Sequence, residues 1–239
     1  MTKHNNRLSS LTLATLVAVA GAVAPTLASA GATATVGVAN IYLWRGQNLT
    51  PDGAQVQGGL NLSSDVGVYG GIWTSSENGG QETDLYVGYA GKAGGFGYDI
   101  SYVSYQYPED GTYPDDGLSD QDFADVILSG SYGPVTLAAY LQTEAPKNAA
   151  TTEDENNYFT ISGKLDAFTL TYGFWDLETA GSGTTGMDEY SHLTLMYAAT
   201  SEVSVGVSKA FSDLDNSAGV EEDPLFYVSY NLSFDLTKK

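Results

Sequence analysis

Apolar and polar residues alternate along most of the chain after residue 31, with a period of two and not the 3.6 of a helix. Between 203 and 208, for example, Val203, Val205 and Val207 are separated by Ser204, Gly206 and Ser208. Such a period predicts strands with one apolar and one polar face. We predict twelve strands, at 33–46, 54–63, 66–75, 82–91, 95–107, 121–132, 135–143, 157–165, 168–177, 189–199, 202–211 and 225–236.

The connections between these strands alternate in length. Short turns are expected at 64–65, 93–94, 133–134, 166–167 and 200–201, and longer loops near 47–53, 76–81, 108–120, 144–156, 178–188 and 212–224. Short turns on one side, long loops on the other and strands of about 10 residues are typical of outer-membrane barrels. A soluble sandwich is the alternative, but its Greek-key links would not sort by parity. The predicted fold is an all-β, up-and-down antiparallel transmembrane β-barrel of about 12 strands, without a helical plug and with both ends in the periplasm.

The first residues have the features of a secretory signal peptide. Lys3 and Arg7 precede an uncharged apolar run, and Ala28-Ser29-Ala30 gives a small-residue cleavage pattern. The apolar run is short for a transmembrane anchor, which is the alternative. We therefore expect a signal peptide at 1–30, cleavage between Ala30 and Gly31, and an outer-membrane barrel domain at 31–239.

Charge narrows the function. The signal segment holds two of the nine Lys and Arg residues and none of the 29 acidic ones, so the mature chain has seven basic residues and a formal charge of −22. This argues against nucleic-acid binding, which needs a basic surface, and biases any pore toward cations. The chain contains no cysteine, which excludes disulfides and thiolate metal sites.

The polar strand faces carry the candidate site, because in a membrane barrel they line the lumen. We hypothesise that Arg45, with Trp44 on the opposite face, pairs across the lumen with Glu82 or Asp84 to form a constriction that sets ion preference. A salt bridge that only stiffens the barrel is the alternative. Further ionisable lumen candidates are Asp99, Asp125, Lys164 and His192, and the bulky Tyr86, Tyr140 and Trp175 are expected to narrow the interior.

Enzymatic and metal-dependent functions have little support. His192 is the sole histidine of the mature chain, its neighbour Ser191 points to the opposite face, and no G-x-S-x-G elbow is present. Carboxylates of the loop near 212–224 are weak calcium candidates, but lack the spacing of an EF-hand, and a solvated acidic surface bridged to lipopolysaccharide is the preferred interpretation. These weak candidates are Asp213, Asp215, Glu221 and Glu222. No cofactor is expected.

Residues 42–107 resemble the TorF-type porin family. The motifs that carry the resemblance are Tyr42-Leu43-Trp44-Arg45-Gly46, Ala54-Gln55-Val56-Gln57-Gly58-Gly59, Gly70-Gly71-Ile72-Trp73-Thr74-Ser75, Glu82-Thr83-Asp84-Leu85-Tyr86-Val87-Gly88-Tyr89, Phe96-Gly97-Tyr98-Asp99 and Tyr105-Gln106-Tyr107-Pro108. The resemblance implies a Gram-negative outer-membrane barrel with a pore role. It departs from the usual barrel ending, which is an aromatic residue, since Phe234 is followed by five more residues; Phe234 is the expected assembly signal.

The pattern, the charge and the resemblance together predict a porin-like channel for passive diffusion of small solutes or ions, biased toward cations and without enzymatic activity. The alternative is a non-conducting barrel that serves as a surface structural or adhesion protein through its acidic loops. The expected partners are outer-membrane lipid and lipopolysaccharide, the barrel-assembly machinery, and the small solutes or ions themselves.

Overall fold

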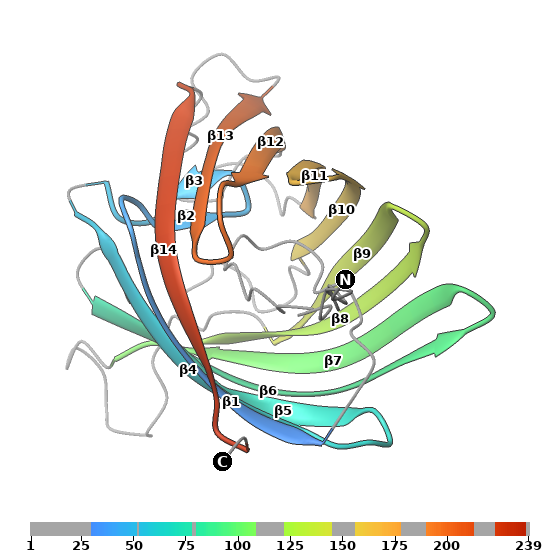
Figure 1. Ribbon diagram of the computed structural model, residues 1–239. Coiled ribbons are helices and arrows are strands. Elements are labelled where there is room, and N and C mark those ends of the chain that lie inside the picture. The colour runs from blue at the N-terminus through green and yellow to red at the C-terminus, as the bar shows by residue number, and fades with distance from the viewer. Residues whose placement is uncertain are drawn as a thin grey trace, which may run out of the picture.

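The computed structural model describes residues 30–51, 53–77, 80–108, 122–144, 156–177, 190–212 and 223–237, and they form a closed antiparallel barrel of twelve strands (Figure 1). Two further short strands, β2 and β3, pair only with each other. The barrel strands are β1 (Gly31–Ala39), β4 (Gln55–Ser63), β5 (Val68–Glu77), β6 (Gly80–Ala93), β7 (Phe96–Gln106), β8 (Phe123–Tyr132), β9 (Val135–Glu144), β10 (Asn156–Leu165), β11 (Phe168–Leu177), β12 (Tyr190–Ala198), β13 (Val203–Ser212) and β14 (Leu225–Asp235).

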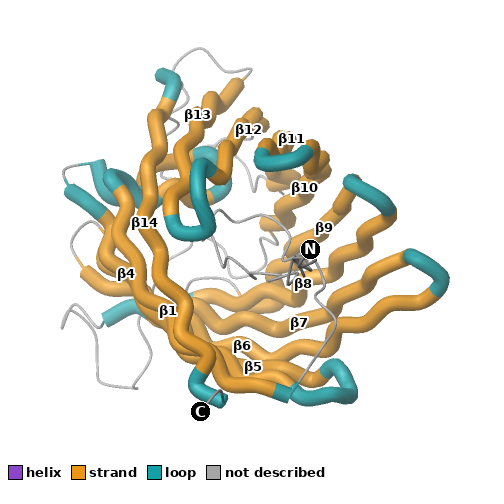
Figure 2. Tube along the Cα trace, in the orientation of Figure 1, coloured by secondary structure: helices purple, strands orange, loops and turns teal. Residues whose placement is uncertain are grey.

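Each barrel strand pairs with its neighbour in the sequence, and β14 closes the barrel on β1, where Thr33 lies opposite Asp235. The connections at one end are tight turns, visible in Figure 2 as short teal segments that join orange strands. Gly94, Gly133 and Asp166 have positive φ in these turns, the conformation that reverses a chain within few residues. β1 begins and β14 ends at this same end, so both termini of the barrel lie beside the short turns.

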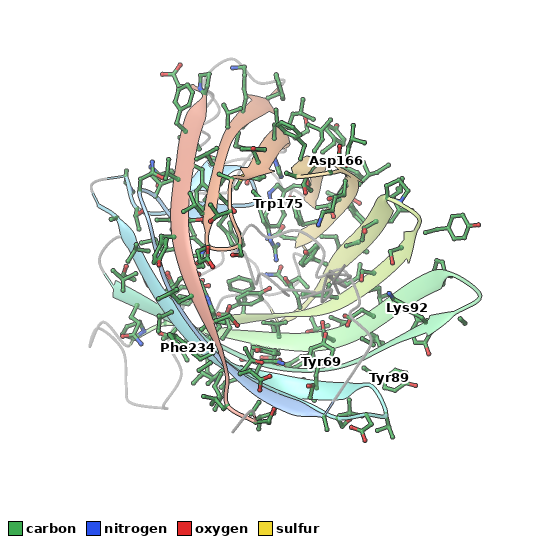
Figure 3. All side chains as sticks on the ribbon, viewed as in Figure 1. Tyr69, Tyr89, Lys92, Asp166, Trp175 and Phe234 are labelled. Atoms are coloured by element: carbon green, nitrogen blue, oxygen red, sulfur yellow. The ribbon has the colours of Figure 1, made fainter. Side chains whose placement is uncertain are left out.

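The barrel wall is apolar outside and polar inside. Val87, Leu137 and Ile161 point outward and have exposed fractions of 55%, 54% and 48%. The residues that alternate with them face inward, and many are polar and buried, such as Ser162 and Thr160. Figure 3 shows the same division for two labelled rings: Trp175 is directed into the barrel and Tyr89 away from it. The alternation that predicts the strands therefore also separates the two faces of the wall.

The predicted twelve-stranded, up-and-down barrel is confirmed, and most strand bounds differ from the prediction by two residues or fewer. Two expectations are wrong. The first strand ends at Ala39 and not at 46, because the chain turns into the barrel there. The longer loop expected at 76–81 does not form, because β5 and β6 stay paired as far as Glu77 and Gly80.

Within the described residues, no helix is long and apolar enough to cross a membrane.

Candidate functional site in the barrel lumen

The connection between β1 and β4 folds into the lumen as a hairpin. It contains β2 (Leu43–Trp44) and β3 (Gln47–Asn48), joined by Arg45 and Gly46. Both linking residues have positive φ, 46° and 90°, as the two central residues of a type I′ turn require. We call residues 40–50 the lumen hairpin.

Hydrogen bonds at the base of the lumen hairpin explain why β1 stops. The Asn40 side chain donates to the carbonyl of Phe226 at 2.7 Å and accepts from the backbone N–H of Val228 at 2.7 Å. Asn40 thus holds the edge of β14 and directs the following residues inward. The backbone N–H of Tyr42 then donates to Thr50 Oγ1 at 2.7 Å, which fixes the two arms together.

The hairpin reaches opposite sides of the barrel. The hydroxyl of Tyr42 donates to Glu82 Oε1 on β6 at 2.8 Å. On the other side, the hydroxyl of Tyr190 on β12 donates to the carbonyl oxygen of Arg45 at 2.9 Å. Strands β6 and β12 lie half-way round the closed order from each other. The hairpin therefore spans the lumen and narrows it.

Arg45 is the one charged residue of the lumen hairpin, and its exposed fraction is 2%. Its Nη2 lies 2.5 Å from Oδ2 of Asp125, which is 1% exposed. Burial is the largest single effect and lowers the pKa of Arg45, but the charge of Asp125, the nearby Tyr105 and the hydrogen bond to Asp125 together raise the pKa of the guanidinium above its ordinary value. Both members of this ion pair are thus removed from solvent.

Four aromatic rings surround the guanidinium. Its Cζ lies 4.5 Å from the ring centroid of Trp44, 4.7 Å from that of Trp175, and 4.9 Å from those of Tyr140 and Tyr158. All four distances fall within the roughly 6 Å over which a ring face attracts a cation. Figure 3 shows Trp175 on the inner side of the barrel wall. The rings compensate for part of the hydration that the buried charge has lost.

His192 packs against Gly46 in the turn of the lumen hairpin and against the ring of Tyr158. Its ring stacks on Tyr158 with planes 7° apart, and its Nε2 lies 2.6 Å from the Tyr158 hydroxyl. His192 Nδ1 contacts Thr194 Oγ1 at 2.9 Å. A Cβ built on Gly46 would lie 2.6 Å from Cβ and Cγ of His192, so only glycine lets the turn sit against this ring.

The predicted lumen acids lie at different levels. Glu82 is 1% exposed and accepts from the hydroxyls of Tyr42 and Tyr107, each at 2.8 Å. Burial, followed by the charges of Glu82 and Asp84, raises the pKa of Tyr42 well above its ordinary value, so Tyr42 stays protonated and can donate. Asp99 is 8% exposed and accepts from the Tyr69 hydroxyl at 2.8 Å.

The structure corrects the predicted pairing of Arg45. The carboxylate that forms an ion pair with it is Asp125, and not Glu82 or Asp84 as predicted. Trp44 was expected on the outer face, but it lies inside, against Arg45, because both belong to the hairpin and not to a wall strand. The residues that the sequence analysis left out of the site are the rings that contact Arg45 or its carbonyl, chiefly Tyr158 and Tyr190.

Other candidates lie away from this cluster. Lys164 is exposed near the short-turn end of β10. Phe234 is 48% exposed on the outer face of β14. Gly31 is the first residue of β1 and directly follows Ala30. The weak calcium candidates, Asp213, Asp215, Glu221 and Glu222, lie outside the described residues; in the described part, no cluster of three or more His, Asp or Glu side chains could hold a metal.

Comparison with solved structures supports the fold. The KdgM porin superposes with a TM-score of 0.50 at 9% identity, with 84% of this chain and 98% of that chain covered. A chain from a structure described as "Unveiling the Mechanism Behind the in-meso Crystallization of Membrane Proteins" gives 0.51 at 10% identity, with coverage of 87% and 85%. The NanC porin gives 0.40 at 10% identity, with coverage of 84% and 97%. At these identities, the likeness to the first two structures shows a porin-like barrel fold alone.

Comparison at the sequence level gives one family and no curated relative. No curated protein matches the chain. One family model, described as "Bacterial protein of unknown function (Gcw_chp)", matches residues 24–213. The match covers well over half of the chain and includes the lumen hairpin and the strands that carry Glu82, Asp125 and Tyr190. The chain therefore belongs to the Gcw_chp family of bacterial proteins.

Proposed function

We propose that this chain is a bacterial outer-membrane channel for passive diffusion of small solutes or ions, with a preference for cations. The observation that carries the proposal is the inverted wall, apolar outside and polar inside. Water would not favour an outer surface with Leu137, Ile161 and Phe226 exposed by 54%, 48% and 71%, whereas lipid would. A closed barrel also satisfies its backbone hydrogen bonds without an open edge, as crossing a bilayer requires.

The proposal also includes export through a cleaved signal peptide and membership of the TorF-type porins. β1 starts at Gly31, directly after the Ala28-Ser29-Ala30 pattern, which supports removal of residues 1–30 as a signal peptide. We also assign the chain to the TorF-type porins. Its motif Tyr42-Leu43-Trp44-Arg45-Gly46 forms one arm and the turn of the lumen hairpin, which gives that motif a structural role.

The preference for cations rests on how lumen charges are distributed. Asp125 is neutralised by Arg45, while Glu82 accepts hydrogen bonds from the phenol hydroxyls of Tyr42 and Tyr107. Lys92 and Lys164, two of the described basic residues, are exposed near the short-turn end. A permeating ion near the hairpin therefore meets mainly negative charge.

The lumen hairpin favours one alternative. Because it spans the lumen and buries Arg45 against four rings, it can hold the barrel closed, as expected of a surface structural or adhesion protein. The two functions differ in one measurable quantity, the single-channel conductance of the mature chain in a planar bilayer.

The experiment compares the mature chain with Glu82→Gln and with the matched control Asp166→Asn, which removes an acid from an exposed turn. An ion that passes about 8 Å from a carboxylate in a water-like dielectric gains about 0.5 kcal/mol, or roughly twofold in selectivity. We expect discrete currents and a K⁺/Cl⁻ permeability ratio above one, lowered about twofold by Glu82→Gln. The ratio in the control should not change. A heat-modifiable, folded barrel that passes no current would refute the channel and favour the surface protein.

A further inference from the structure

The wall opposite Arg45 forms a preorganised cation site. Asp125, Tyr140, Tyr158 and Trp175 come from four consecutive strands, β8 to β11, and converge on one point of the lumen. We call these four residues the guanidinium box. Their exposed fractions are 1%, 6%, 0% and 8%. Because they belong to wall strands, their positions do not depend on the hairpin's own backbone.

The guanidinium box recognises its cation by ring faces and one carboxylate. The guanidinium donates from Nη2 to Asp125, and Nε of Arg45 has no hydrogen-bond partner among the described residues. A guanidinium has five N–H donors, and a site that used its full fork would satisfy more of them. The box is therefore suited to a small planar cation held mainly by π faces, with one anchoring charge.

Arg45 enters this box as part of a separate, small element. β2 and β3 form two residue pairs, and their turn is held in the positive-φ region at both central positions. The remaining contacts of the hairpin, such as Tyr42 with Glu82, lie on other parts of the wall. In chemical terms, the side chain of Arg45 is a ligand tethered to the barrel by a short loop.

We propose that the guanidinium box is a binding site for small organic cations of the guanidinium class, and that Arg45 fills it as a tethered competitor. This proposal names a substrate class for the proposed channel. It rests on the proposed channel function, because the solute would reach the site through the channel. A ligand held by a short tether has an effective concentration in the millimolar range or above, so a free cation must exceed this concentration to displace Arg45. Removal of the Arg45 side chain eliminates the competitor and leaves the box intact.

Binding can be measured without current. Of the three tryptophans, Trp44 and Trp175 contact the guanidinium, so intrinsic fluorescence reports its replacement. The refolded mature chain, Arg45→Ala and the double variant Arg45→Ala/Asp125→Asn are titrated with methylguanidinium chloride, against KCl at equal ionic strength. We expect a saturable change in Arg45→Ala with a midpoint in the millimolar range, and an increase of a few degrees in its melting temperature at about ten times that midpoint.

In the double variant the midpoint of the fluorescence change should lie at a methylguanidinium concentration at least tenfold higher, because the anchoring carboxylate is missing. The unaltered chain should show no saturation over the same concentration range. An Arg45→Ala response equal to that in KCl, or an equal response in the double variant, would overturn the proposal. If Arg45→Ala does not fold, Arg45→Lys replaces it. Its ammonium lacks the planar face, so methylguanidinium should displace it at lower concentrations than it displaces Arg45; no difference from the unaltered chain would count against the site.

Conductance separates this proposal from the channel function. If Arg45→Ala conducts, methylguanidinium should block its current with the same midpoint as the fluorescence change. Saturable binding with no current in any variant would refute the channel and leave the binding site supported. Current without saturable binding would refute the binding site and leave the channel supported.

Discussion

Asp125→Asn tests whether the ion pair holds the lumen hairpin in place. The substitution keeps the shape of the side chain but leaves the Arg45 charge buried without its carboxylate. Loss of one partner of a buried pair costs about 3–5 kcal/mol. The four ring faces near Arg45 remain and stabilise the cation in part, so we take the lower end, about 3 kcal/mol. At 1.4 kcal/mol per factor of ten, the population of the displaced hairpin should increase about 100-fold.

A single engineered thiol measures that population, because the chain has no cysteine of its own. Gln47→Cys places the thiol on β3, where the native side chain is 7% exposed, and a charged thiol reagent reaches it when the hairpin leaves its seat. Val66→Cys, at a turn residue that is 71% exposed, gives the rate for an accessible thiol. The ratio of the two rates should increase about 100-fold in Asp125→Asn.

A double variant provides the control. In Arg45→Met/Asp125→Asn neither charge of the pair is left buried, so the labelling ratio should fall well below that of Asp125→Asn alone. A labelling ratio that changes less than threefold in Asp125→Asn, or that is equally high in the double variant, would refute the reasoning that a buried charge pair seats the hairpin.

Three further changes test other contacts. Gly46→Ala places a Cβ 2.6 Å from His192 at a residue whose φ is 90°. It should lower the stability of the hairpin by about 1–3 kcal/mol in the same labelling assay. Gly53→Ala is the control, because a Cβ there has no atom within 4 Å, and it should leave the labelling ratio unchanged. Ile161→Arg on the outer wall should destabilise the barrel in lipid by about 2–4 kcal/mol in urea unfolding, and Val66→Arg by about 0–1; equal effects would contradict a lipid-facing wall. Burial and then the charge of Glu82 raise the pKa of Tyr42 in the folded chain. The contribution of Tyr42 to stability is therefore present below about pH 10, the pKa of an unfolded tyrosine, and is lost as the pH rises above that value. The decrease in unfolding midpoint at alkaline pH should be smaller in Tyr42→Phe.

The barrel could be predicted from the sequence because its information is local. In a strand that separates lipid from lumen, the side on which each residue lies is fixed by parity, so Val203, Val205 and Val207 identify an outer face without any knowledge of their neighbours. The turns are local as well. Asn78-Gly79 is a favoured sequence for a two-residue hairpin, and it lies between Glu77 and Gly80, the last paired residues of β5 and β6.

The site depends on contacts that parity does not encode. Asp125, Glu82 and Asp84 all belong to inward faces, so pattern alone could not choose the partner of Arg45, which is 80 residues away from Asp125. The lumen hairpin was missed because Ile41, Tyr42, Leu43 and Trp44 form an apolar run that suits a strand as well as a buried arm. What separates the two is Asn40, whose side chain satisfies the edge of β14, a strand at the other end of the sequence.

The lumen hairpin also changes how the charge of the lumen should be understood. Arg45 brings one positive charge into an acidic interior and pairs it with Asp125, so the hairpin adds bulk at that level with little net charge. Displacement of the hairpin does two things at once: it removes the bulk and uncovers the Asp125 carboxylate. A lumen from which the hairpin is displaced would therefore be both wider and more negative than the lumen observed. In a barrel that conducts as proposed, size and charge selectivity would be coupled through one ion pair, and a solute that carries a guanidinium would gain from both changes.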